Sequence, residues 1–143
     1  MAVVLPALAQ VQRTQIPTTM TILREISRDA VNDARREDNL TNLSLNGVLN
    51  RIAEKHAADM LEQGYFAHES PGGETVQDRY VAAGGSPYRL VAENIARCDG
   101  CPVPADPNTV RQLHRDWMES PEHRANILAR GLTQYGFGIA ETD

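Results

Sequence analysis

Apolar residues recur at helical spacing through the first half of the chain. Between Thr21 and Asn39 they fall three and four residues apart with charged residues between them, which predicts an amphipathic helix. A second, wider apolar face runs from Ser44 to Leu61, and Gly64 suits the position just beyond a helix end. The two patterns predict two long helices joined by a polar turn.

The second half of the chain carries three shorter helical patterns. Residues 75–83 predict a short helix that ends at a pair of glycines. A further helix is expected to be capped by Asn108 or Thr109. Another begins at Ser120, because serine is a favoured capping residue and Pro121 would occupy the first turn.

Two apolar segments have strand-like composition. Residues 90–96 are apolar on both faces, and residues 135–140 alternate glycine with larger residues, which indicates that one face lies against a close neighbour. No repeat or linker divides the chain. The predicted organisation is one α+β domain over residues 20–143, preceded by a lead-in over residues 1–19.

Composition and charge narrow the class of protein. The 143 residues are 41% hydrophobic and 23% charged, which is ordinary for a soluble domain. The net charge of −5 argues against a nucleic-acid partner, because binding to phosphates needs an excess of lysine and arginine. No stretch reaches the length of a transmembrane span. The apolar start, Ala2–Ala9, is either a segment that packs on the domain or the remnant of a signal peptide.

The only two cysteines, Cys98 and Cys101, are separated by two residues in a stretch rich in glycine and proline. This spacing occurs in local disulfides, in redox motifs and in half of a zinc site. No second Cys or His pair at zinc spacing accompanies them, and the surroundings indicate a loop. A local disulfide and a reduced pair both remain open.

Four stretches, in this order, resemble bacterial members of the CAP superfamily of cysteine-rich secretory, antigen 5 and pathogenesis-related proteins. The stretches are residues 56–60 (HAADM), 66–71 (FAHESP), 92–96 (AENIA) and 117–128 (WMESPEHRANIL). The resemblance covers residues 22–140. It implies a three-layer α-β-α sandwich with a small antiparallel sheet and a wide cleft. Relatives continue into one more strand, so we expect a sheet that lacks the family's last strand.

The resemblance also implies a cleft that holds two histidines and two glutamates around a divalent cation. His68 and Glu93 match the first of each. The second glutamate would fall at Ser120, so Glu119 is one position out of register. The second histidine belongs to a motif that this chain does not contain, and His123 is the nearest substitute.

The residues themselves favour a pairing of His68 with Glu93. An ionised carboxylate among the apolar residues 91–96 is costly unless it is paired, and an imidazole would satisfy it. Such a pair is either purely structural or part of a weak zinc site in which His68 and His123 are the metal ligands. Ser70 and Ser120 stand near these histidines, although both precede proline and suit turns or caps.

The other two histidines suit structural positions. His56 lies beside the apolar face of the second predicted helix, so we expect it at the edge of the core with a bond to the backbone. His114 is flanked by Arg111 and Arg115, so we expect it to be solvated.

The residues and the resemblance together predict a secreted or cell-envelope domain and favour binding over catalysis, without deciding whether it is an enzyme. It would bind zinc or another divalent cation weakly, together with a small apolar, lipid, glycan or peptide ligand, in a cleft formed by His68, Glu93, Glu119 and His123. The alternative is a protease-like hydrolase that uses the same cleft. Neither interpretation identifies the ligand, because CAP domains bind varied ligands.

Overall fold

The structure, a computed structural model, describes residues 19–142, so most of the predicted lead-in lies outside the described residues. The described part contains five helices and two short strands. They are α1 (Thr19–Glu37), β1 (Ser44–Leu45), α2 (Gly47–Gln63), α3 (Val76–Ala82), α4 (Pro107–Glu119), α5 (Pro121–Ile127) and β2 (Gln134–Tyr135).

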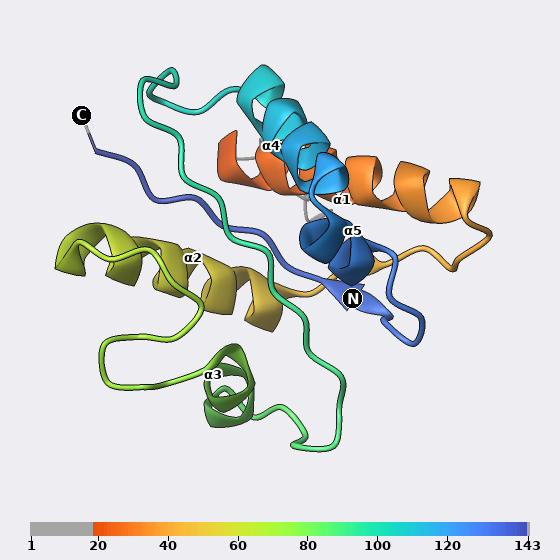
Figure 1. The fold of residues 1–143 in the computed structure, drawn as a ribbon, viewed down its shortest axis with the longest axis horizontal. Coiled ribbons are helices and arrows are strands. Elements are labelled where there is room, and N and C mark those ends of the chain that lie inside the picture. Colours follow the sequence, from red (N-terminus) through yellow and green to blue (C-terminus); the bar gives the residue numbers. More distant parts are fainter. Residues whose placement is uncertain (1–18, 143) are drawn as a thin grey trace, which may run out of the picture.

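The elements form three layers. Helices α1, α4 and α5 contact one another on one side, and α2 contacts α3 on the other. The extended segments 90–100 and 134–142 run between α2 and the α1–α4 pair, as Figure 1 shows. This arrangement agrees with the predicted α+β sandwich and places the middle layer where both strand-like segments were expected.

The α1–α4 layer holds the best-packed part of the core. Val31 on α1 and Val110 on α4 are each only 1% exposed, and Trp117 packs in the same cluster. Arg35 is equally buried, and its guanidinium donates to the carbonyls of Ile127 and Ala129. Arg35 therefore ties the end of α5 to α1 while its buried donors stay satisfied.

The helix boundaries follow the sequence signals closely. Gly64 ends α2 with φ of 70°, a left-handed conformation that favours glycine, and Thr75 forms a capping box at the start of α3. The predicted cap of α4 was wrong. Asp106 occupies that position instead of Asn108 or Thr109, since its carboxylate accepts from the Thr109 N–H and Pro107 begins the helix.

The sheet differs from the antiparallel arrangement that we expected. In the described part of the chain, β1 pairs with β2 in parallel, with Ser44 opposite Gln134 and Leu45 opposite Tyr135. The two strands are separated in sequence by all of α2 to α5, so no hairpin forces an antiparallel pairing. Residues 90–96 are extended but form no ladder.

The glycine-rich segment after β2 lies against α2, the close neighbour that its glycines indicated, although of residues 135–140 only Tyr135 belongs to a strand. A Cβ atom added at Gly136 would come within 2.3 Å of the Leu49 carbonyl carbon, and one added at Gly138 within 2.3 Å of the Glu54 nitrogen. Only glycine allows the backbone of this segment to approach the helix so closely. The close contact holds residues 136–138 of the middle layer against α2.

Candidate binding site

Glu93 is the centre of a cluster of charged and polar side chains. Its side chain projects from the extended segment that runs between the helix layers and is only 12% exposed. One carboxylate oxygen, Oε1, lies 2.8 Å from Nδ1 of His68. The predicted pair is therefore present. Because a carboxylate accepts, His68 Nδ1 carries the hydrogen, and its Nε2 remains outside this bond.

The second oxygen of Glu93 is occupied by a residue that sequence reasoning missed. Arg79 of α3 donates from Nη2 to Glu93 Oε2 at 2.9 Å, and its side chain is only 8% exposed. The same guanidinium reaches the carbonyls of His68 and Glu74. Arg79 thus neutralises the buried carboxylate and fastens the turn that carries His68.

His56 of α2, the helix that contacts α3, approaches the same carboxylate. Its Nε2 lies 3.9 Å from Glu93 Oε1 and donates to the Ala67 carbonyl at 2.9 Å, so Nε2 carries the hydrogen. The backbone bond agrees with the predicted role of His56 as a residue at the edge of the core. Its position also carried a signal, because His56 falls on the apolar stripe of α2 between Ile52 and Met60.

A tyrosine and an aspartate support His56 from behind. The Tyr65 hydroxyl donates to Asp59 Oδ2 at 2.6 Å, and its oxygen lies 3.5 Å from His56 Nδ1. Burial, together with the bond to Asp59, raises the pKa of Tyr65 to about 12. The same bond from Tyr65 is the main cause of the lowered pKa of Asp59. Tyr65 and Asp59 therefore each keep one protonation state near neutral pH, and the Tyr65 hydroxyl stays beside the imidazole.

The other two predicted cleft residues make different contacts. The His123 Nδ1 atom lies 2.9 Å from the Ser120 hydroxyl, one turn earlier, and the His123 carbonyl accepts from Asn94. Glu119 is exposed at the end of α4. Among the described residues, no hydrogen bond or ion pair joins either side chain to the Glu93 cluster. Asn126 makes the connection instead, donating to the Glu93 carbonyl at 3.2 Å.

These contacts do not match a complete metal site. Among the described residues, no three histidine, cysteine, aspartate or glutamate side chains gather around a common point. Both oxygens of Glu93 already have partners, and the positive charge of Arg79 beside them opposes a second cation. A resident zinc with several protein ligands does not fit this cluster.

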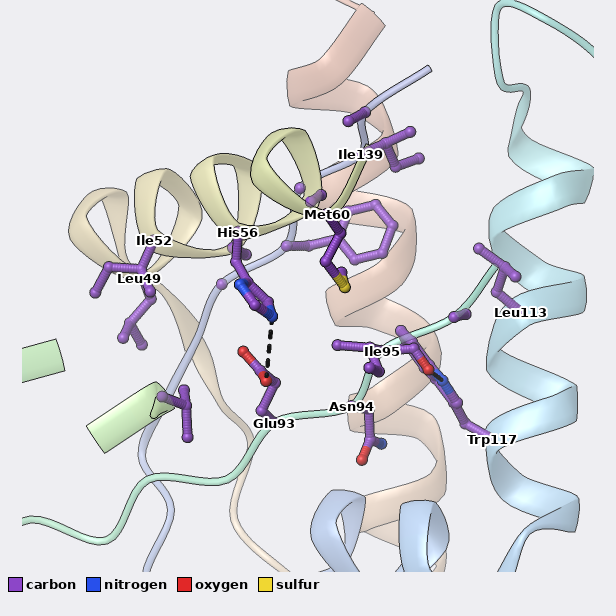
Figure 2. A pocket seen from close by; sticks show the side chains of 18 of the residues that line it. Leu49, Ile52, His56, Met60, Glu93, Asn94, Ile95, Leu113, Trp117 and Ile139 are labelled. Atoms are coloured by element: carbon purple, nitrogen blue, oxygen red, sulfur yellow. Dashed lines mark hydrogen bonds and ion pairs between the residues drawn. The ribbon is translucent and has the colours of Figure 1, made fainter. Parts of the chain in front are cut away.

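A large cavity opens beside the cluster. Its volume is about 1000 Å³, and it lies between α2 and α4 along the two extended segments. Figure 2 shows apolar side chains on its walls, with His56 and Glu93 facing each other across one part of it. The labelled apolar residues are Leu49, Ile52, Met60, Ile95, Leu113, Trp117 and Ile139.

The cysteine pair forms a local disulfide, so the first of the open alternatives is confirmed. Cys98 and Cys101 are bonded, and both residues line the cavity at the end of the segment that carries Glu93. The bond closes the turn at that end of the middle layer.

Comparison with known proteins identifies the family. The sequence profile of the cysteine-rich secretory protein family, CAP, matches residues 28–143. The chain belongs to the CAP family. This confirms the resemblance drawn from the four motifs.

Two relatives are similar to this chain over most of its length. The uncharacterized protein YkwD of Bacillus subtilis (strain 168) is 28% identical over 129 residues, which are 90% of this chain and 47% of that protein. A crystal structure of an extracellular protein containing an SCP domain, from Bacillus anthracis str. Ames, matches with a TM-score of 0.72 and 28% identity. It aligns with 86% of this chain, which spans only 38% of that protein.

A more distant structure supports the fold alone. An outer surface protein from Borrelia burgdorferi has a TM-score of 0.58 at 17% identity, covering 78% of this chain and 76% of that one. Within residues 19–142, we find no helix long and apolar enough to cross a membrane.

Proposed function

We propose that this CAP domain is a non-catalytic binding module that takes an apolar ligand into the cavity between α2 and α4. The cavity carries this proposal. The cavity offers about 1000 Å³ between the two helix layers, which is room for a ligand. Ligand sites are mostly apolar clefts of roughly 300–1000 Å³ with a few fixed polar groups. Here, Glu93 and His56 would supply those polar groups.

Catalysis is less well supported than binding. A general base must reach the proton that it takes from a substrate, whereas both oxygens of Glu93 are held by partners within 2.9 Å, which suits a residue fixed in a structural cluster. The Ser70 hydroxyl accepts from the Glu74 N–H, as a turn residue does. The Ser120 hydroxyl bonds to His123 within one helical turn, and no recorded contact orients that imidazole from its other side.

In this proposal, a divalent cation plays only a minor role beside the apolar ligand. Nε2 of His68 lies on a half-exposed ring and has no hydrogen-bond partner among the described residues. One imidazole, even joined by His123, supplies fewer protein ligands than a stable zinc site uses. We therefore infer that any cation binds weakly and serves the ligand rather than the fold.

A location outside the cytoplasm, in the medium or the cell envelope, is part of the proposal. The disulfide between Cys98 and Cys101 supports it, because such bonds persist in oxidising compartments. The similar SCP-domain protein from Bacillus anthracis is described as extracellular.

Two neighbouring alanines on α2 allow a matched test. Ala57 lines the cavity, whereas Ala58 does not. We expect the fluorescent apolar dye 1-anilinonaphthalene-8-sulfonate to bind saturably to the folded protein. We expect Ala57→Phe to weaken its binding at least tenfold because the ring fills the cavity, and Ala58→Phe to leave it unchanged. Circular dichroism would establish that both variants are folded. Absence of saturable binding, or equal affinities of the two variants, would refute the proposal.

A further inference from the structure

We propose that a second groove, between α2 and α3, binds a small polyhydroxy compound that carries a phosphate monoester, such as a sugar phosphate. Arg51 and Lys55 would hold the phosphate. Every residue that lines this groove falls between Val48 and Ala83, so neither extended segment of the middle layer contributes to it. The inference is therefore independent of the apolar ligand proposed above.

The groove presents polar groups from three parts of the chain. Its volume is about 770 Å³, which is ample for a small ligand. On α2, the lining residues recur at helical spacing from Val48 to Gln63 and form one continuous stripe. The rest of the lining comes from the turn at residues 70–74 and from α3, where Arg79 is the charged member.

Two cations on the α2 stripe have no counterion among the described residues. Arg51 and Lys55 lie one helical turn apart, and both are exposed. Neither side chain makes an ion pair or a hydrogen bond within residues 19–142. Like charges at this spacing repel each other, and the first turn of α2 contains no acidic residue to offset them. An anion bound by both side chains would relieve this repulsion.

The carboxylates of α2 nearest to Lys55 in the sequence are already engaged. Glu54 accepts from Arg24 at 2.7 Å. Asp59 accepts from Tyr65 at 2.6 Å, and this bond is the main cause of its lowered pKa, to which the charge of Lys55 contributes least. The cation pair is therefore available to an anion from outside the chain.

The acidic groups of the groove lie toward its other end. Asp59 is about 12 Å along the helix axis from Arg51. Burial is the main cause of the raised pKa of Tyr65, the partner of Asp59, and the charge of Glu74 adds to it, so Glu74 acts at the Asp59 end. A ligand that spans the groove would carry its anion at one end and uncharged polar groups at the other.

Two adjacent cations match a dianion better than a single negative charge. A phosphate monoester carries about two negative charges near neutral pH, whereas a carboxylate carries one. The arginine fork and the lysine ammonium both bind phosphate oxygens well. We therefore assign a phosphate monoester to the end of the groove that contains Arg51 and Lys55.

The remainder of the groove suits hydroxyl groups. Ser70 Oγ accepts from the Glu74 N–H and keeps its own hydrogen to donate. Arg79 Nε is a buried donor with no partner among the described residues, and such donors are almost always paired in folded proteins. Hydroxyls both donate and accept, so a polyhydroxy body in the groove would satisfy these donors and the carboxylates beside them.

Isothermal titration calorimetry with glucose 6-phosphate tests this inference. We expect saturable binding of one ligand per chain, and at least tenfold weaker binding after the double substitution Arg51→Gln and Lys55→Gln. The matched control is Arg111→Gln with Arg115→Gln, which removes the same charge from an exposed pair one turn apart on α4, outside the groove. The control should change the affinity less than about twofold. Circular dichroism would establish that both double variants are folded.

Three further ligands test the assigned class. Glucose lacks the phosphate, glucuronate carries a single carboxylate instead, and inorganic phosphate lacks the polyhydroxy body. We expect each of them to bind at least tenfold more weakly than glucose 6-phosphate. Absence of saturable binding of glucose 6-phosphate at millimolar concentration would overturn the inference, as would equal losses of affinity in the two double variants. Equal binding of any of the three comparison ligands would overturn the assigned class.

Discussion

Each oxygen of the Glu93 carboxylate has its own partner, and the two partners differ in exposure. The His68 side chain, which bonds Oε1, is half-exposed, whereas the Arg79 side chain, which bonds Oε2, is buried. Removing one member of a buried ion pair leaves an uncompensated charge, which costs far more than losing an exposed pair. Arg79 is thus the residue on which the stability of the cluster depends most.

Replacing Arg79 with methionine tests this role. We expect Arg79→Met to lower the free energy of unfolding by about 3–5 kcal/mol in urea denaturation, because Glu93 loses its buried cation. Arg97→Ala is the control. Arg97 and Asp99 form an exposed pair, with side chains 66% and 81% accessible, so its loss should cost less than about 1 kcal/mol.

A second variant keeps this prediction testable if Arg79→Met alone does not fold. Adding Glu93→Gln removes the uncompensated charge, so the double variant should recover part of the lost stability. Equal costs for Arg79→Met and Arg97→Ala would contradict the assignment.

His114 provides the residue-scale prediction for pH. We expected a solvated side chain, and this was wrong. His114 falls on the buried stripe of α4 between Val110 and Trp117, and its Nδ1 is buried with no hydrogen-bond partner among the described residues. Burial lowers its pKa below the ordinary 6.5, although Asp33 on α1 acts in the opposite direction.

The sign of the pH effect follows from this shift. As the pH falls through about 6.5, the unfolded chain takes up a proton on His114 before the folded protein does, so stability decreases. We expect His114→Gln to reduce the loss of stability between pH 7 and pH 5, measured by urea denaturation at several pH values. An unchanged pH dependence in this variant would show that His114 does not contribute.

The single residues of the site were only partly predictable from the sequence. Glu93 could be identified because a carboxylate in an apolar run requires a partner, and the pairing with His68 is confirmed. Arg79 could not be identified, because an arginine on a short helix has no periodicity that indicates burial. The location of its partner depends on the path of the chain between α3 and residue 93.

At the scale of elements, helices were predictable and strands were not. A helix satisfies its backbone within one segment, so local signals such as Gly64 and Thr75 located its ends. A strand needs a partner elsewhere in the chain. The composition of residues 90–96 correctly indicated an extended segment, but nothing local reveals whether a neighbouring strand lies beside it.

The contact between α2 and the segment after β2 depends on the absence of a side chain. We expect Gly138→Ala to destabilise the protein by about 1–3 kcal/mol, because its Cβ would collide with the α2 backbone at Glu54. Gly47→Ala, at the start of the same helix, has 3.6 Å of clearance and should change stability by less than about 1 kcal/mol. Thermal and urea unfolding of the two variants would compare them, and equal stability would contradict the close contact.

The whole molecule combines a well-packed helical layer with an open middle layer. Helices α1 and α4 hold the buried core around Val31 and Val110. The cavity lies between that layer and α2, and the segments that line it are held mainly by side chains. The family could be predicted from its motifs, and the three layers followed from that resemblance. The cavity could not, since its size depends on how closely the layers approach.

Amide hydrogen exchange across the middle layer tests the central claim most directly. The account predicts rapid exchange at residues 91–92 and 139–140 in the free protein, because their N–H groups make no hydrogen bond among the described residues. Saturation with 1-anilinonaphthalene-8-sulfonate should slow exchange on both walls, because the bound dye covers them. Strong protection of both walls in the free protein, or none after saturation with the dye, would contradict the account.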